Sequence, residues 1–153
     1  MSRTPEQILR AAGVEFTVHE HVPVATVAEI LDALPYPAEE HVKTLAFDAD
    51  GQIALVGLRG SDRVAYGKLA RALGVARDKL APLSPERVRE ELGLEPGGVC
   101  LLIDRDDVRR VVDVRVAALD RAFTGSGRND ASFELAAADL IATSGAEVAE
   151  IAR

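Results

Sequence analysis

The chain has 153 residues, of which 48% are hydrophobic, so one domain can bury a core without disulfides or structural metals. Its net charge is 18 − 25 = −7 at pH 7, which disfavours a DNA-binding protein because such proteins need a basic face for the phosphates. Tryptophan is absent and aromatic residues make up 4%, so a stacking platform for single-stranded nucleic acid is not expected.

Cysteine usage and hydropathy indicate the compartment. The one cysteine, Cys100, cannot form an internal disulfide, which fits a reducing cytoplasm. No apolar run approaches the roughly 20 residues that span a bilayer, and the first residues lack a basic segment followed by an apolar one. We therefore expect a cytoplasmic protein that does not enter a membrane.

The first forty residues predict two helices separated by a strand. Residues 4–7 form a capping box with proline at the first helical position, which predicts a helix that ends at Gly13. Polar and apolar residues alternate over 16–19, as in a short strand. A second capping box at 26–29 opens a helix that Pro35 stops.

The central part of the chain predicts a β-hairpin followed by a helix. Residues 42–47 and 52–58 are strand candidates, and the Asp-Ala-Asp-Gly sequence at 48–51 is a strong turn signal between them. Residues 66–73 have the apolar spacing of an amphipathic helix, and Gly74 follows as its C-cap.

The last part of the chain mixes helices with further strands. A helix is expected between Ser84 and Gly93, and another near 136–141 after a strand at 131–135. Further strand candidates are the continuous apolar run at 99–103, the valines at 111–114 and residues 148–151. Because a tight hairpin occurs among helical connections, we predict one α/β domain over residues 1–153, with a strongly curved mixed sheet flanked by helices.

Lys43 is the most unusual residue of a predicted strand, since it follows Val42 and precedes Thr44 and Leu45 in an apolar segment. Burying a lysine costs free energy unless its ammonium group is paired or reaches a cleft. One interpretation is an edge lysine that guards against strand pairing. The other is a fixed charge for a phosphate or hydroxyl group of a ligand. The residues alone leave both interpretations open.

Two glycine-rich segments also have two interpretations each. Gly97 and Gly98 suit an ordinary loop, or a loop whose N–H groups hold a carbonyl oxygen as it becomes an oxyanion. The segment 125–130, Gly-Ser-Gly-Arg-Asn-Asp, suits a surface loop or a binding loop. It has the spacing of neither a P-loop nor a dinucleotide-binding loop, so neither ATP nor NAD is indicated.

The histidines and the cysteine are weaker candidates. His19 and His21 share a strand face, but no cysteine pair or His-Glu-x-x-His helix supports a metal site, so no metal or other cofactor is expected. His19 remains a candidate for a ligand-facing group. Cys100 lies in an apolar run, where burial raises the pKa of a thiol and makes it inert as a nucleophile.

The order of these motifs resembles the YbaK family of aminoacyl-tRNA deacylases, which also occurs as the editing domain of bacterial prolyl-tRNA synthetases. The resemblance covers residues 15–153. Its specific parts are Val-Lys-Thr-Leu at 42–45 and Gly-Ser-Gly-Arg at 125–128, and Lys-Leu-Ala at 68–70 and Gly-Gly-Val at 97–99 add to it.

The resemblance implies a small barrel-like mixed sheet and the hydrolysis of the ester that links a wrong amino acid to tRNA, often tRNA-Pro. It implies that Lys43 holds the terminal adenosine or its phosphate, and that N–H groups around Gly97 and Gly98 face the ester carbonyl. The expected substrate-binding residues are His19, Thr26, Thr44, Ser126, Gly127 and Asp130. Val27 and Ile30 are further candidates for the pocket wall.

One departure from the family concerns its Gly-x-x-x-Pro loop, where this chain has Leu101 in place of the proline. Two functions follow. The first is a free-standing deacylase that acts in trans on the aminoacylated 3′ end of a mischarged tRNA, by positioned water or substrate-assisted attack. The alternative is a non-catalytic module of the same fold that binds aminoacyl-tRNA or a nucleotide. A prolyl-tRNA synthetase is a candidate partner, whereas DNA and membranes are not expected as partners.

Overall fold

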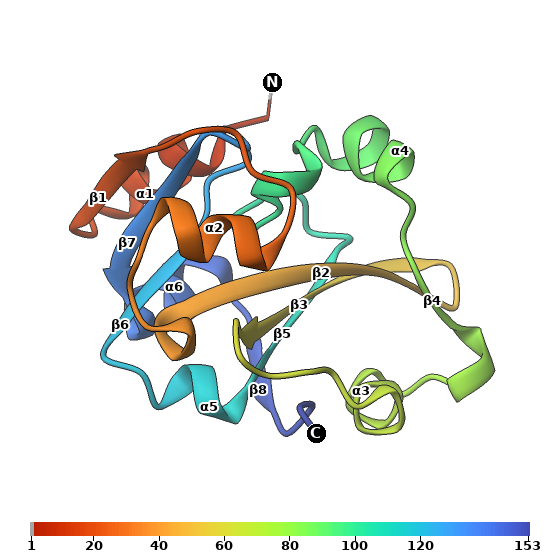
Figure 1. The fold of residues 1–153 in the computed structure, drawn as a ribbon. Coiled ribbons are helices and arrows are strands. Elements are labelled where there is room, and N and C mark those ends of the chain that lie inside the picture. The colour runs from red at the N-terminus through yellow and green to blue at the C-terminus, as the bar shows by residue number, and fades with distance from the viewer. Residues whose placement is uncertain (1) are drawn as a thin grey trace.

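The computed structural model describes residues 2–153 as a mixed sheet of eight strands with helices packed around it (Figure 1). The strands are β1 (Phe16–Glu20), β2 (His41–Ala49), β3 (Gln52–Arg59), β4 (Leu80–Pro82), β5 (Arg109–Asp113), β6 (Arg121–Gly125), β7 (Ala131–Ala136) and β8 (Glu147–Ala149). The expected single mixed α/β domain is confirmed.

The helices are short and several begin as the sequence predicts. They are α1 (Pro5–Ala12), α2 (Val27–Ala33), α3 (Tyr66–Leu73), α4 (Pro85–Arg87), α5 (Val114–Ala117) and α6 (Ala137–Ser144), with the 3-10 helices η1 (Ala38–Glu40), η2 (Arg77–Lys79) and η4 (Pro96–Gly98) and the π-helix η3 (Val88–Leu92). Thr4 and Gln7 form the capping box of α1, and Gly13 ends this helix in the left-handed conformation. The helix expected from Ser84 to Gly93 is divided into α4 and η3.

The strands follow the order β1-β7-β6-β2-β3-β5-β8, and β4 pairs with β2 beside this path. Strand β2 is antiparallel to β3 and β4 but parallel to β6, so the sheet is mixed as expected. Strands β1 and β8 are the two ends of the order among the described residues. The sheet is therefore open, and it is not the closed barrel that a barrel-like sheet suggests.

The predicted β2–β3 hairpin is confirmed. Its two-residue turn consists of Asp50 and Gly51, which have φ angles of 53° and 90°. Two positive φ angles in a two-residue loop match the right-handed twist of the flanking strands. The Asp48 carboxylate accepts a hydrogen bond from the Gly51 N–H at 2.8 Å and so stabilises the turn.

The apolar run at 99–103 does not form the expected strand. The carbonyl oxygens of Leu101 and Ile103 accept hydrogen bonds from the Arg110 guanidinium at 3.1 and 2.8 Å. Strand β5 instead lies beside β3. A continuous apolar run indicates burial but does not specify a pairing partner. Similarly, Val114 begins α5 and does not extend β5.

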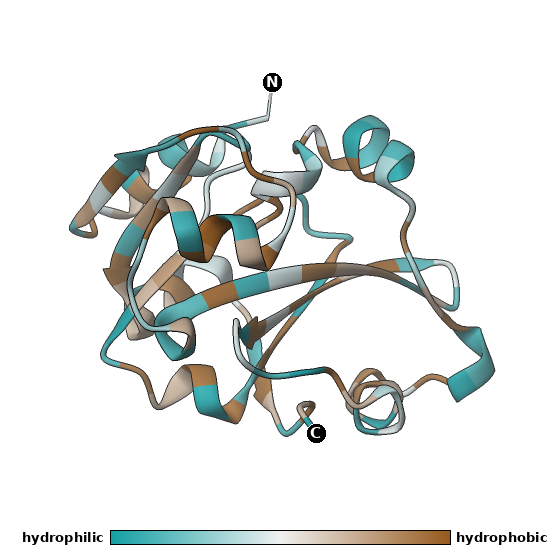
Figure 2. Ribbon diagram, in the orientation of Figure 1, coloured by the Kyte–Doolittle hydropathy of each residue, from teal (hydrophilic) through white to brown (hydrophobic). Residues whose placement is uncertain are grey.

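Two apolar clusters fill the two faces of the sheet. Leu55 belongs to the larger cluster, with residues of α1 and α6, and its neighbour Val56 belongs to the smaller one, with residues of α3. Successive residues of a strand point to opposite faces, so the two clusters lie on opposite sides of β3. In Figure 2, hydrophilic and hydrophobic residues alternate along β2, which crosses the front of the sheet. This strand also carries the first residues of the candidate site.

Candidate functional site

Strand β2 changes partners along its length, which leaves a gap in the sheet beside its middle. It pairs with β6 at 41–42 and with β4 at 47–49. The Gly60 N–H donates a hydrogen bond to the His41 carbonyl at 2.6 Å. In an antiparallel pair every second residue bonds to the partner strand, so His41, Lys43 and Leu45 direct their N–H and C=O groups towards β3. The N–H and C=O of Thr44 therefore point away from β3 and into the gap.

A cavity of about 200 Å³ opens at this gap. Its lining comprises residues 24–27, 41–45, 96–97 and 123–125, together with Ile30, Gly60, Val99 and Ser132. Because five consecutive residues of β2 contribute, the cavity lies at the edge of the strand and not over one face of it. Segments far apart in the chain meet here, as is usual for a small-ligand site.

Lys43 places a positive charge in this lining. Its ammonium group donates a hydrogen bond to the main-chain carbonyl of Asp62. Burial lowers the pKa of Lys43, and the negative charge of Asp62 opposes that shift, while Arg63 adds to it. An ammonium group has three donors, so the bond to Asp62 leaves donors for a ligand. Strand β2 is interior in the strand order, but within the described part of the chain residues 43–45 pair with no strand on the side of the gap.

The side chain of Asp62 is itself fixed by two arginines. The Arg59 Nε atom lies 2.7 Å from the carboxylate of Asp62, and Arg115 lies 3.3 Å from it. These ion pairs hold the pKa of Asp62 below its usual range, with the hydrogen bond from Arg59 as the largest cause. The loop that accepts the Lys43 hydrogen bond is thus held in place by charged partners.

Helix α2 contributes an apolar part of the lining through Val27 and Ile30, two residues expected in the pocket wall. Thr26 is the N-cap of this helix and also lines the cavity. His41 and Phe123, from β2 and β6, line it with stacked rings whose centroids are 5.3 Å apart.

His41 adds a neutral ring to the cavity. Burial lowers the pKa of His41, although the hydrogen bond to the Leu34 carbonyl at 3.0 Å acts in the opposite direction. The imidazole is therefore uncharged at neutral pH. Neither His41 nor Phe123 is a predicted site residue, because each is an ordinary strand residue until β2 and β6 are seen to meet.

The glycines of η4 permit a close backbone crossing. A Cβ atom at Gly97 would overlap the carbonyl of Val24, and one at Gly98 would overlap the main chain of Arg128. Gly97 lines the cavity, and its N–H lies in the first turn of a helix, where N–H groups have no partner within the helix. The Gly98 N–H already donates to the Glu95 carbonyl at 2.8 Å. Of these two glycines, only Gly97 is among the lining residues of the cavity.

Four of the predicted site residues line the cavity, namely Lys43, Gly97, Thr26 and Thr44. Gly98, His19, Ser126, Gly127 and Asp130 are not among the lining residues.

The residues outside the lining have structural contacts. The Ser126 hydroxyl donates to the Ala131 carbonyl at 2.6 Å, which closes the loop between β6 and β7. Asp130 is ion-paired with Arg128 at 2.9 Å. His19 makes a 2.7 Å hydrogen bond to Glu134 on the neighbouring strand.

Gly127 also serves the loop. Its φ of 92° lies in the region that favours glycine, and its N–H donates to the Gly98 carbonyl at 2.7 Å. The backbone of the glycine-rich segment therefore packs against η4 and helps to hold Gly97 and Gly98 in place.

Thr124 is a cavity residue that the sequence did not reveal. It is 2% exposed and lines the cavity from β6. Its hydroxyl oxygen and that of Thr44 are buried and have no hydrogen-bond partner among residues 2–153. The available signal was a threonine after Ala-Phe at the end of a strand, which is too common to indicate a site.

Leu101, which departs from the family loop, and its neighbour Cys100 lie in the core. Leu101 is fully buried, and its side chain packs close to Gly57. Burial raises the pKa of the Cys100 thiol to about 12, so this cysteine is protonated and unreactive at neutral pH. Within residues 2–153, His, Cys, Asp and Glu side chains form no group of three that suits a metal ion. None of the helices in that range has the length and apolar character to cross a bilayer.

A small cavity with one half-buried cation, a backbone-lined wall and an open mixed sheet defines a small-ligand domain. The model of the aminoacyl-tRNA editing domain matches residues 21–143, and the chain belongs to this family. Membership of this family supports a role in aminoacyl-tRNA editing. The resemblance to the family that the motifs indicated is confirmed.

Relatives and solved structures agree with this assignment. The chain is 33% identical over 111 residues to the proline–tRNA ligase of Bacillus subtilis, and this match covers 72% of the chain. It spans about a fifth of the length of such curated relatives, 19% in this case.

Two solved structures have the same fold over nearly the whole chain. The hypothetical protein APE2540 has a TM-score of 0.85 and 26% identity, with 97% of this chain and 98% of that chain covered. A candidate trans-editing enzyme for prolyl tRNA synthetase has a TM-score of 0.79 and 26% identity, with 90% and 87% covered.

Proposed function

We propose that this chain hydrolyses, in trans, the ester bond of a mischarged aminoacyl-tRNA, and that the tRNA is tRNA-Pro. The observation that carries the proposal is the half-buried Lys43 among the lining residues of a small cavity at a gap in the sheet. The choice of tRNA-Pro is supported by the proline–tRNA ligases and the candidate trans-editing enzyme for prolyl tRNA synthetase among similar proteins. A prolyl-tRNA synthetase is the proposed partner.

In this proposal each residue of the cavity has a separate role. The two remaining donors of Lys43 bind a phosphate or hydroxyl oxygen of the terminal adenosine. The N–H of Gly97 donates to the ester carbonyl as it becomes an oxyanion. The Gly98 N–H is already bonded to Glu95, so Gly98 shapes the loop and is not a donor.

The nucleophile is water, or a hydroxyl or side chain of the substrate itself. When water attacks, its oxygen forms a bond to the ester carbon, the bond from that carbon to the ribose oxygen breaks, and the ribose oxygen takes the proton. When a side chain of the amino acid attacks, its oxygen or sulfur forms that bond instead, and the amino acid leaves the ribose as a cyclic ester or thioester. Cys100 is excluded as a protein nucleophile by its burial and raised pKa. The protein contributes positioning and oxyanion stabilisation.

The test is deacylation of a panel of tRNAs charged with cognate or wrong amino acids, including alanyl- and cysteinyl-tRNA-Pro. Wild type is compared with Lys43→Ala and with the matched control Lys79→Ala, because Lys79 is exposed and outside the cavity. We expect hydrolysis of a mischarged species by wild type and by the control, and its loss in Lys43→Ala. Full activity in Lys43→Ala would remove Lys43 from the mechanism.

A second candidate is a non-catalytic module that binds aminoacyl-tRNA or a nucleotide. Leu101 in place of the family proline and the occupied N–H of Gly98 favour it, since both alter the expected oxyanion loop. Binding of a non-hydrolysable aminoacyl-adenosine analogue, with no turnover of any charged tRNA by the folded protein, would support this candidate over the first.

A further inference from the structure

Two buried hydroxyl groups at the gap between β2 and β6 have no part in the mechanism above. They belong to Thr44 and Thr124, and neither has a hydrogen-bond partner within residues 2–153. A buried hydroxyl that lacks a partner costs free energy, and folded proteins contain few of them. Both residues line the cavity, so a ligand bound there can supply the missing partner.

The two threonines lie close together in the sheet. Thr124 is the register partner of Val42 in the parallel β2–β6 pair, and Thr44 follows two residues later on β2. Residues two apart on a strand share a face, so both hydroxyl groups stand on the face of Val42 where the two strands separate. The N–H and C=O of Thr44 point towards the same edge.

The charge of the cavity restricts what these groups can bind. Lys43 also lines the cavity, and its positive charge disfavours a second cation such as the α-ammonium group of an amino acid. A hydroxyl group donates one hydrogen bond and accepts others, so it can pair with two threonine hydroxyls at once. The apolar neighbours Val42 and Val99 offer it no competing partner.

We propose that Thr44 and Thr124 bind a hydroxyl group of the substrate and that Thr124 determines specificity for substrates that carry it. This inference rests on the proposed function. An aminoacyl-tRNA can present such a hydroxyl from two sources, the side chain of the amino acid or the 2′ position of the terminal ribose. Both sources have the same chemistry, and the substrates of the experiment distinguish them.

The experiment is a double-mutant cycle in which the Thr124 hydroxyl is removed from the protein and each candidate hydroxyl is removed from the substrate. Wild type and Thr124→Val, which removes the hydroxyl at nearly constant volume, are assayed on seryl- and alanyl-tRNA-Pro. Both proteins are also assayed on a second pair of substrates. These carry the amino acid at the 3′ position of tRNA-Pro and end in either adenosine or 2′-deoxyadenosine, so they differ only in the 2′-hydroxyl. Thr44→Val is tested in the same way. Thr124→Ser keeps the hydroxyl, and Thr17→Val is the control because Thr17 is an exposed strand threonine.

We expect Thr124→Val to lower kcat/KM for the substrate with the bound hydroxyl about fivefold to tenfold more than for its partner without it, the effect of one hydrogen bond. Thr124→Ser should restore most of this difference, and Thr17→Val should leave it unchanged. Coupling to the serine side chain or to the 2′ position identifies the source.

Equal losses on all substrates, or no loss, would overturn this inference and leave the proposed hydrolysis intact. The absence of hydrolysis of every charged tRNA by folded wild type would overturn the proposed function itself, and the inference with it. The two failures are therefore read from different measurements.

Discussion

Lys43 donates its hydrogen bond to the backbone of Asp62 and not to the Asp62 carboxylate, which is occupied by Arg59 and Arg115. The lysine is thereby held at the cavity without a tight ion pair of its own. A carboxylate bonded to the ammonium group would compete with an anionic ligand, whereas a carbonyl oxygen positions the charge and leaves it available.

Lys43→Met should remove deacylation while changing the melting temperature by only a few degrees. The variant loses a hydrogen bond of about 1 kcal/mol, and it also loses the cost of burying a charge, which acts in the opposite direction. The measurement is a thermal melt of both proteins beside the deacylation assay. Unfolding of the variant at room temperature would mean that Lys43 is needed for the fold itself.

The stability difference between Lys43→Met and wild type should depend on pH. Burial lowers the pKa of Lys43 below its value in the unfolded chain, near 10.4, so the charged form is disfavoured in the folded protein. That penalty is full below the folded pKa and disappears as the pH rises towards the unfolded pKa. Thermal melts at neutral and alkaline pH should show that the stability of Lys43→Met relative to wild type decreases as the pH rises. A difference that is constant with pH would contradict the lowered pKa.

Gly97→Ala should lower both stability and activity, because its Cβ would overlap the Val24 carbonyl. We expect a loss of about 1–3 kcal/mol in the free energy of unfolding, as for other overpacked sites. The matched control is Gly67→Ala in α3, where a Cβ would meet no atom of the described residues within 4 Å apart from its chain neighbours and the backbone of its own helix. That change should be neutral or stabilise the helix by up to about 1 kcal/mol. Urea unfolding measures both, and an unchanged Gly97→Ala would show that the backbone crossing is loose.

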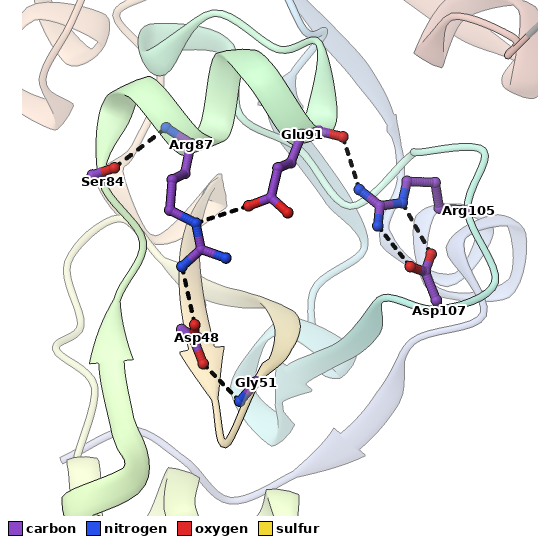
Figure 3. A network of polar contacts seen from close by, with 7 residues as sticks. All are labelled: Asp48, Gly51, Ser84, Arg87, Glu91, Arg105 and Asp107. Carbon is purple, nitrogen blue, oxygen red and sulfur yellow. Dashed lines mark hydrogen bonds and ion pairs between the residues drawn. The ribbon is translucent and has the colours of Figure 1, made fainter.

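The contacts of Arg87 predict an acid-sensitive region at the tip of the β2–β3 hairpin. Arg87 lies 3.0 Å from Asp48 and 2.8 Å from Glu91, and it joins the hairpin to α4 and η3 (Figure 3). Hydrogen bonds from Arg87 and from the Gly51 N–H lower the pKa of Asp48. A lowered carboxyl pKa stabilises the fold above the unfolded value, near 3.9, and this contribution is lost as the pH falls below it.

Asp48→Asn should therefore be less stable than wild type at pH 7, by a small amount because the pair is partly exposed. The difference in stability between the two proteins should shrink as the pH falls below the unfolded pKa and through the lowered folded pKa of Asp48. Thermal melts over the acidic range measure the effect, and Asp32→Asn, an exposed aspartate of α2, is the control. A difference that does not shrink on acidification would place the effect outside the ion pair.

Cys100 should resist thiol reagents in the folded protein. It is fully buried, and its raised pKa of about 12 leaves almost no thiolate at pH 8. We expect its reaction with a disulfide reagent to be slow in buffer and complete in urea. Rapid labelling of the folded protein would mean that the segment 99–103 opens frequently.

The local elements of this fold were predictable from short stretches of sequence. The capping box at Thr4 and the Asp50-Gly51 turn depend on neighbouring residues, so their signals lie within a few positions of the chain. The segment 99–103 was wrongly predicted as a strand, because its apolar residues specify burial but not the partner. The hydrogen bonds from Arg110 and the pairing of β3 with β5 determine its conformation, and both depend on residues outside the segment.

The candidate site likewise has a part that the sequence predicts and a part that only the tertiary structure shows. The sequence by itself identified the family, the Lys43 strand and the glycine segments, because a charge in an apolar strand and a run of glycines are visible without coordinates. Only the tertiary structure separated β2 from β6 beyond Val42, brought Thr124 and His41 to the cavity, and assigned the Ser126 loop to backbone support. A gap between strands depends on register and partner choice, which are properties of contacts between distant segments and are not encoded at any single position.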